Sequence, residues 1–111
     1  PGVTVGDIGA VIQKYVEGQG FSIVRELTGH GVGHKLHEDP FIPNFGKPGH
    51  GVAMKPLMTV AIEPIVTAGG RFTKTLSDHW TIVTQDKSWS AHFEHSLVIT
   101  QNGCEILTKR T

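Results

Sequence analysis

The sequence predicts one α+β domain, in which an N-terminal helix is followed by a mainly antiparallel sheet. Helical periodicity occurs only near the N-terminus, β-rich segments follow one another over residues 59–108, and an Asn-Gly pair separates the last two. The chain has 111 residues, of which 38% are hydrophobic. This is enough for one core, so residues 1–111 are expected to form a single domain.

The expected helix covers residues 5–20, VGDIGAVIQKYVEGQG. Its apolar residues have the three- and four-residue spacing of an amphipathic helix: Val5, Ile8, Val11, Ile12, Tyr15 and Val16. Thr4 or Asp7 can cap the beginning of this helix. Gly18 or Gly20 can cap its end.

Residues 29–51 are rich in glycine and proline and show no periodicity, so little regular structure is expected there. Pro64 is an irregularity within an otherwise β-rich segment. Asn102-Gly103 favours a tight hairpin between the last two expected strands. The expected strands are residues 21–24, 59–66, 71–76, 80–84, 91–100 and 104–108.

The charge balance gives no electrostatic argument for nucleic acid or an anionic membrane as a partner. The chain carries 10 basic and 10 acidic residues and has a formal net charge of zero. Its one cysteine, Cys104, excludes an intrachain disulfide and fits a reducing compartment. The apolar run CEILT predicts that this thiol is buried. No signal-like segment and no apolar run near 18 residues is present, which predicts a cytoplasmic protein.

The stretch TGHGVGHKLHEDP, residues 28–40, combines three histidines with two carboxylates. His30 and His34 are four residues apart, and a helix would place them on one face. Three glycines at alternate positions oppose a helix, however, and favour an extended loop. This stretch alone leaves two interpretations open: a metal or catalytic site, and a hydrogen-bonded loop with surface histidines.

Two carboxylates lie inside apolar strand segments. Glu63 in VAIEPIV is costly to bury unless it is paired or metal-bound, and no basic residue lies within seven positions along the chain. An edge strand with Glu63 facing water is the alternative. Alternation in AHFEHSLVIT places one set of residues on a single face: His92, Glu94, Ser96 and Val98. Two such carboxylates and a histidine cluster together indicate one shared site.

The residues of this shared site have the donor atoms of a divalent-metal centre. Carboxylate oxygens with one imidazole suit Mn, Fe(II), Co or Zn. Two such ions can share a bridging carboxylate, an arrangement that needs about five protein ligands. The chain offers three strong candidates, which are His30, Glu63 and Glu94.

Four stretches in this order resemble the C-terminal half of the catalytic domain of type I methionine aminopeptidases: GHGVGHKLHEDP, PNFGKPG, MTVAIEP and SAHFEHSLVIT. The resemblance covers nearly the whole chain and implies one lobe of the pita-bread fold. It implies metal-dependent removal of the initiator methionine from nascent proteins. Proline-specific peptidases of this fold share some of these motifs, but His95 stands where they usually carry an acidic residue. Leu57 in KPLM stands where the family usually has glycine.

The resemblance also implies roles for single residues. His30, Glu63 and Glu94 would bind two divalent ions (Co, Mn, Fe or Zn), with Glu94 bridging both. His37 would contact the scissile peptide and stabilise the tetrahedral intermediate, and Glu63 would shuttle a proton. Trp80 would line the pocket for the methionine of an N-terminal peptide substrate. The other histidines match no family ligand and are expected to be ordinary, among them His34, His50, His79 and His92.

The family's two remaining ligands are aspartates from the first half of its catalytic domain. The aspartates of this chain lie outside those motifs: Asp7, Asp39, Asp78 and Asp86. The chain is therefore expected to carry an incomplete site and to be inactive alone. The N-terminal half of the same enzyme, or a companion chain, would complete it, and the ribosome is a further partner to consider.

Two other interpretations stay open. The chain could be a non-catalytic pita-bread binding module, or His30, His34 and His37 could hold one structural zinc. In either case, half of a two-lobed sheet exposes an apolar edge, so we expect dimerisation, a companion chain or poor solubility.

Overall fold

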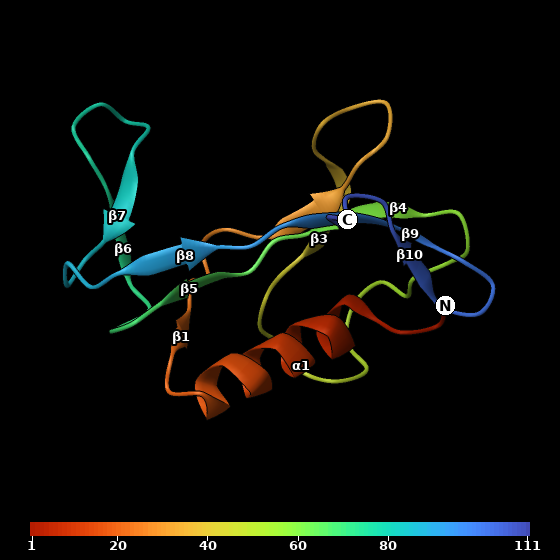
Figure 1. The fold of residues 1–111 in the computed structure, drawn as a ribbon, viewed down its shortest axis with the longest axis horizontal. Coiled ribbons are helices and arrows are strands. Elements are labelled where there is room, and N and C mark those ends of the chain that lie inside the picture. The colour runs from red at the N-terminus through yellow and green to blue at the C-terminus, as the bar shows by residue number, and fades with distance from the viewer.

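The computed structural model describes residues 1–111 and contains one helix and ten strands (Figure 1). Every strand pairing is antiparallel, which confirms the predicted α+β class with a mainly antiparallel sheet. The helix is α1 (Val5–Gly18). The strands are β1 (Ser22–Ile23), β2 (Gly29–Gly31), β3 (Glu38–Ile42), β4 (Thr59–Ile62), β5 (Ile65–Thr67), β6 (Thr73–Thr75), β7 (Ile82–Thr84), β8 (Ser90–His92), β9 (His95–Ile99) and β10 (Cys104–Ile106).

Both predicted capping residues act at the start of α1. The Thr4 hydroxyl accepts a hydrogen bond from the Asp7 N–H (3.1 Å), and Asp7 Oδ2 accepts one from the Thr4 N–H (2.8 Å). This reciprocal capping box satisfies two amide groups that the helix itself leaves free. The helix ends at Gly18 with Gln19 as its C-cap residue, and Gly20, one of the two predicted glycines, follows in the left-handed conformation (φ 85°). α1 has 14 residues, and the chain has no helix with the length and apolar character needed to cross a membrane.

The strands form sheets of five (β10-β9-β4-β2-β3), three (β1-β5-β8) and two (β6-β7) strands. One antiparallel ribbon joins the two larger sheets, because β4 continues into β5 and β8 continues into β9 (Figure 1). The register is unchanged across the break: Ile62 pairs with His95, and three residues further along each strand Ile65 pairs with His92. Glu63 therefore lies opposite Glu94, at the point where the two sheets meet.

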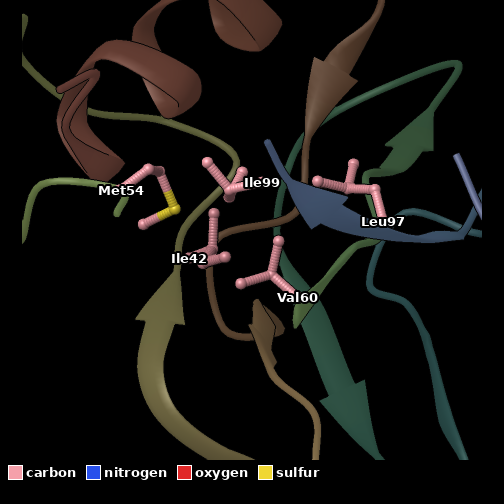
Figure 2. Packing of buried hydrophobic residues seen from close by; sticks show 5 residues of the cluster. All are labelled: Ile42, Met54, Val60, Leu97 and Ile99. Carbon is pink, nitrogen blue, oxygen red and sulfur yellow. The ribbon is translucent and has the colours of Figure 1, made fainter. Parts of the chain in front are cut away.

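The five-stranded sheet has a core face that packs against α1. Alternate residues of the central strands supply most of the buried cluster: Ile42, Met54, Val60, Leu97 and Ile99 (Figure 2). Helix residues Val5 and Ile8 pack against this cluster. Side chains alternate between the two faces of a strand, so Ala61 and Glu63 point away from Val60, to the opposite face. That opposite face is where the polar residues gather.

Several expectations about the strands need correction. β2 and β3 form in the segment expected to lack regular structure, because β2 pairs with a strand on each side. The segments 59–66 and 91–100 are each divided in two, and Pro64 lies at one of the breaks. Cys104 is exposed rather than buried, because β10 is the edge strand of its sheet. The predicted hairpin at Asn102-Gly103 is confirmed by the pairing of β9 with β10.

The turn at Leu57 keeps the backbone conformation expected from the family resemblance. Leu57 has a φ of 74°, the left-handed region that glycine adopts without steric cost, so the backbone keeps the turn even without the glycine.

An apolar groove lies between α1 and the ribbon, lined by side chains that include the exposed Val11, Tyr15 and Phe93. This exposed apolar surface lies between the helix and a sheet face, beside the point where the strands break, and not at the sheet edge that was expected.

The capping box predicts a specific acid sensitivity. Backbone hydrogen bonds from Thr4 and then Gly49 lower the pKa of the Asp7 carboxyl below its usual value. Because this pKa is lower in the folded than in the unfolded chain, the stabilisation is present above about pH 4 and is lost as the pH falls through the folded-state pKa. We expect the urea midpoint to fall less between about pH 5 and pH 2.5 in Asp7→Asn than in the parent chain. Equal acid sensitivity of the two proteins would contradict this role.

Candidate metal centre

Glu63 and Glu94 form a direct cross-strand pair at the break in the ribbon. The unchanged register places them opposite each other, and side chains in such positions have Cβ atoms roughly 4.5–5.5 Å apart. The backbone N–H of Phe93 donates to the carbonyl of Pro64 (3.0 Å), which keeps the strands together through the break. The Glu63 side chain is only 14% exposed, whereas Glu94 is exposed.

His30 reaches the same point from the neighbouring strand. In β2 it pairs with Ala61, which lies two residues before Glu63 and so on the same face. Its Nε2 atom lies 2.9 Å from Glu63 Oε1. Its Nδ1 atom lies 2.8 Å from the carbonyl oxygen of Gly31. A carbonyl oxygen can only accept, so Nδ1 carries a hydrogen, and Nε2 is the nitrogen available to a ligand.

The contact between His30 and Glu63 requires a proton or a metal ion between the two atoms. With hydrogen on Nδ1, a neutral imidazole would direct the lone pair of Nε2 at a carboxylate oxygen. A proton shared between the two atoms, or a metal ion bound by both, resolves this repulsion. The 2.9 Å between Nε2 and Oε1 is the length of a charge-assisted hydrogen bond, and it also leaves both atoms within reach of one shared ion.

The structure brings together all three predicted ligands. One ligand atom from each of His30, Glu63 and Glu94 lies within 4.8 Å of the other two. No other group of three or more histidine, cysteine or acidic side chains in the chain has this geometry. One imidazole and two carboxylates suit a divalent ion of the Mn, Fe, Co and Zn series. The donor set and its spacing therefore fit the ion that the sequence predicts.

The other two histidines of residues 28–40 lie in different places. His37 is exposed, and its ring centroid is 4.2 Å from that of His30, with the planes tilted by 59°. It is therefore beside the cluster and free to contact a bound molecule. His34 is exposed and is not part of the cluster. The geometry thus gives no support to a zinc site made by the three histidines of this stretch.

Trp80 lies on a different hairpin from the strands that carry the cluster. It is 86% exposed in the turn between β6 and β7, where its backbone N–H donates to Asp78 Oδ1. The β6–β7 hairpin projects beyond β8, at the end of the molecule away from β4 and β9 (Figure 1). A role of Trp80 in substrate binding stays a prediction.

His92 is the residue that sequence reasoning missed. It was expected to be ordinary, yet its Nε2 atom lies 3.0 Å from Glu63 Oε2. The signal was present in the alternation of AHFEHSLVIT, which places His92 on the same face as Glu94. Without the pairing of β5 with β8, that face could not be related to Glu63.

A sheet with one helix-covered face and a histidine–carboxylate cluster on the other is consistent with a metallopeptidase lobe. The chain belongs to metallopeptidase family M24, whose sequence profile matches residues 1–101. It is 54% identical over 109 residues to methionine aminopeptidase 1 of Bacillus subtilis. That alignment covers 98% of this chain and 44% of the relative, so the chain spans less than half the length of the curated relative.

Solved structures agree with this assignment. The chain matches methionine aminopeptidase from Thermotoga maritima with a TM-score of 0.96 and 53% identity, over 99% of this chain and 44% of that one. A dipeptidase from Pyrococcus horikoshii matches with a TM-score of 0.58 and 28% identity, over 99% of this chain and 25% of that one. These matches confirm the expected fold and the resemblance to the methionine aminopeptidases.

The close approach of β2 and β3 can be tested at Gly31. A Cβ atom added there would lie 2.2 Å from the carbonyl oxygen of Asp39, so the backbone of β3 would have to move. We expect Gly31→Ala to lower the free energy of unfolding by about 1–3 kcal/mol, measured by urea denaturation. Gly18→Ala is the matched control, because nothing lies within 4 Å of the added atom, and it should leave stability unchanged or raise it. Similar effects of both substitutions would contradict the close packing.

Proposed function

We propose that this chain is one lobe of a methionine aminopeptidase, which hydrolyses the peptide bond after the initiator methionine of nascent proteins. The observation that carries the proposal is the convergence of His30, Glu63 and Glu94 on one face of an M24 lobe. The close likeness to proteins named methionine aminopeptidase supports this substrate class. When bound, divalent ions of the Co, Mn, Fe or Zn type would activate water and polarise the peptide carbonyl.

Residues of this chain would transfer the proton of the attacking water and donate a hydrogen bond to the peptide carbonyl. Glu63 is largely shielded from solvent and is positioned to take a proton from the attacking water and pass it to the leaving amine. His37 is exposed beside His30 and can donate a hydrogen bond to the carbonyl oxygen as negative charge develops on it. Glu94 would bridge two ions. The role of Trp80 in the methionine pocket rests on the family resemblance alone.

The remaining ligands would come from aspartates outside this chain. Three ligands are too few for a two-ion centre, and the chain corresponds to 44% of the length of its Bacillus subtilis relative. The apolar groove beside α1 supports a polypeptide partner packed against this lobe, either the N-terminal half of the same enzyme or a companion chain. A cytoplasmic location and contact with the ribosome are consistent with this function.

The alternatives make different predictions. A proline-specific peptidase of the same fold would cleave before proline and leave Met-Gly peptides intact. A non-catalytic module would keep its partner affinity when Glu94 is replaced. A structural zinc at His30, His34 and His37 would be lost on replacement of His34, which lies outside the cluster.

Metal binding tests the ligand assignment. We expect His30→Ala, Glu63→Gln and Glu94→Gln each to weaken Mn(II) or Co(II) binding at least about tenfold in isothermal titration calorimetry, because each removes a donor. His34→Ala is the matched control within the same segment and should leave the affinity unchanged. Loss of binding in His34→Ala, with normal binding in Glu94→Gln, would favour the three-histidine zinc site.

Reconstitution tests the function itself. The chain alone is expected to leave Met-Gly peptides uncleaved, because its metal site lacks ligands. Adding the N-terminal part of the Bacillus subtilis relative that has no counterpart here should give metal-dependent release of methionine, and Glu94→Gln should abolish it. Ordinary activity of the chain alone would contradict the incomplete site. Cleavage of Xaa-Pro peptides instead would favour the proline-specific alternative.

A further inference from the structure

We infer that His92 is a positioning residue of this centre, which holds one oxygen of Glu63 so that the other faces the metal ion. The inference rests on the proposed metal centre and extends it to a residue that matches no family ligand. Glu63 lies between two imidazoles: Oε1 is 2.9 Å from His30 Nε2, and Oε2 is 3.0 Å from His92 Nε2. Each carboxylate oxygen of Glu63 therefore contacts a different histidine.

The strand register explains why His92 reaches Glu63. In the ladder between β5 and β8, His92 pairs with Ile65, two residues beyond Glu63. Its side chain therefore lies on the face shared by Glu63 and Glu94, diagonal to Glu63 across the ribbon. Backbone pairing on β8 fixes the position of the ring, and no loop movement is needed to make the contact.

The geometry makes His92 a donor to Glu63 rather than a ligand of the same ion. The ligand atoms of His30, Glu63 and Glu94 all lie within 4.8 Å of one another, and His92 is outside this group. It contacts Glu63 Oε2, whereas His30 contacts Oε1. A carboxylate cannot donate, so the contact needs a hydrogen on His92 Nε2, which would leave that nitrogen without a lone pair for a metal.

Such a hydrogen bond would limit the conformations of Glu63. A carboxylate with one free oxygen can rotate, or can bind an ion through both oxygens. Holding Oε2 leaves Oε1 as the metal-facing atom, and it also offsets part of the repulsion between Glu63 and Glu94. Outer hydrogen bonds of this kind typically change metal affinity by about 10–100-fold. The Glu63 side chain is only 14% exposed, whereas that of His92 is 47% exposed.

The test compares variants that keep or remove the donor. Mn(II) and Co(II) affinities would be measured by calorimetry for the parent chain, His92→Ala and His92→Gln. Each protein would be measured alone and after reconstitution with the N-terminal part of the Bacillus subtilis relative. We expect His92→Ala to weaken binding about tenfold or more, and His92→Gln, which keeps an N–H donor, to remain within about threefold of the parent. The Co(II) absorption spectrum should change only in His92→Ala. His95→Gln is the control, since His95 lies on the other face of the ribbon and contacts Thr108.

Urea denaturation of each variant would separate loss of folding from loss of affinity. Unchanged affinity of a folded His92→Ala variant would overturn the inference and leave the metal centre intact. Equal weakening by the Ala and Gln variants would also overturn it, because the hydrogen bond would then not be the cause. If the parent bound neither ion in either form, the metal centre would itself be wrong and the inference would fail with it.

Discussion

The pairing of Glu63 with Glu94 across one antiparallel ribbon is the constraint on which the rest of the site depends. Two carboxylates directly opposite each other repel, and such a pair destabilises an ordinary sheet. Here the pair lies where the ribbon passes from the five-stranded to the three-stranded sheet. Two histidines contact Glu63, and a divalent ion would supply the remaining positive charge. Cation binding at this position would explain why the sheet tolerates the repulsion between Glu63 and Glu94.

The same ribbon supports the core and the site on opposite faces. Val60 and Leu97 pair across β4 and β9 and pack toward α1, while Ala61 and Ser96, one residue further along, face the cluster. A slip of one residue would move the apolar side chains to the site face and the carboxylates into the core. Burial of the core therefore fixes the register that brings the ligands together.

The sequence alone predicts the features that depend on residues close together along the chain. Helical spacing and the capping pair at Thr4 and Asp7 predicted α1, and Asn102-Gly103 predicted the last hairpin. The ligand candidates followed from carboxylates misplaced in apolar strands. β2 and β3 were not predictable in this way, because the glycine-rich β2 and the proline-containing β3 gain order only by pairing with β4 and with each other.

His92 and Cys104 show the same limit. The contact of His92 with Glu63 depends on which strands are neighbours, and the exposure of Cys104 depends on β10 being an edge. Neither fact can be found in the local sequence, where one residue resembles a surface histidine and the other a core thiol. Pairing between strands distant in sequence decides both.

Anomalous diffraction from crystals soaked in Mn(II) would show whether His30, Glu63 and Glu94 bind an ion together, because it locates the ion without reference to activity. We expect a peak at the break in the ribbon, about 2.0–2.3 Å from His30 Nε2 and from a carboxylate oxygen of both Glu63 and Glu94. A peak held by His30, His34 and His37, or no peak near Glu94 at saturating Mn(II), would contradict this expectation.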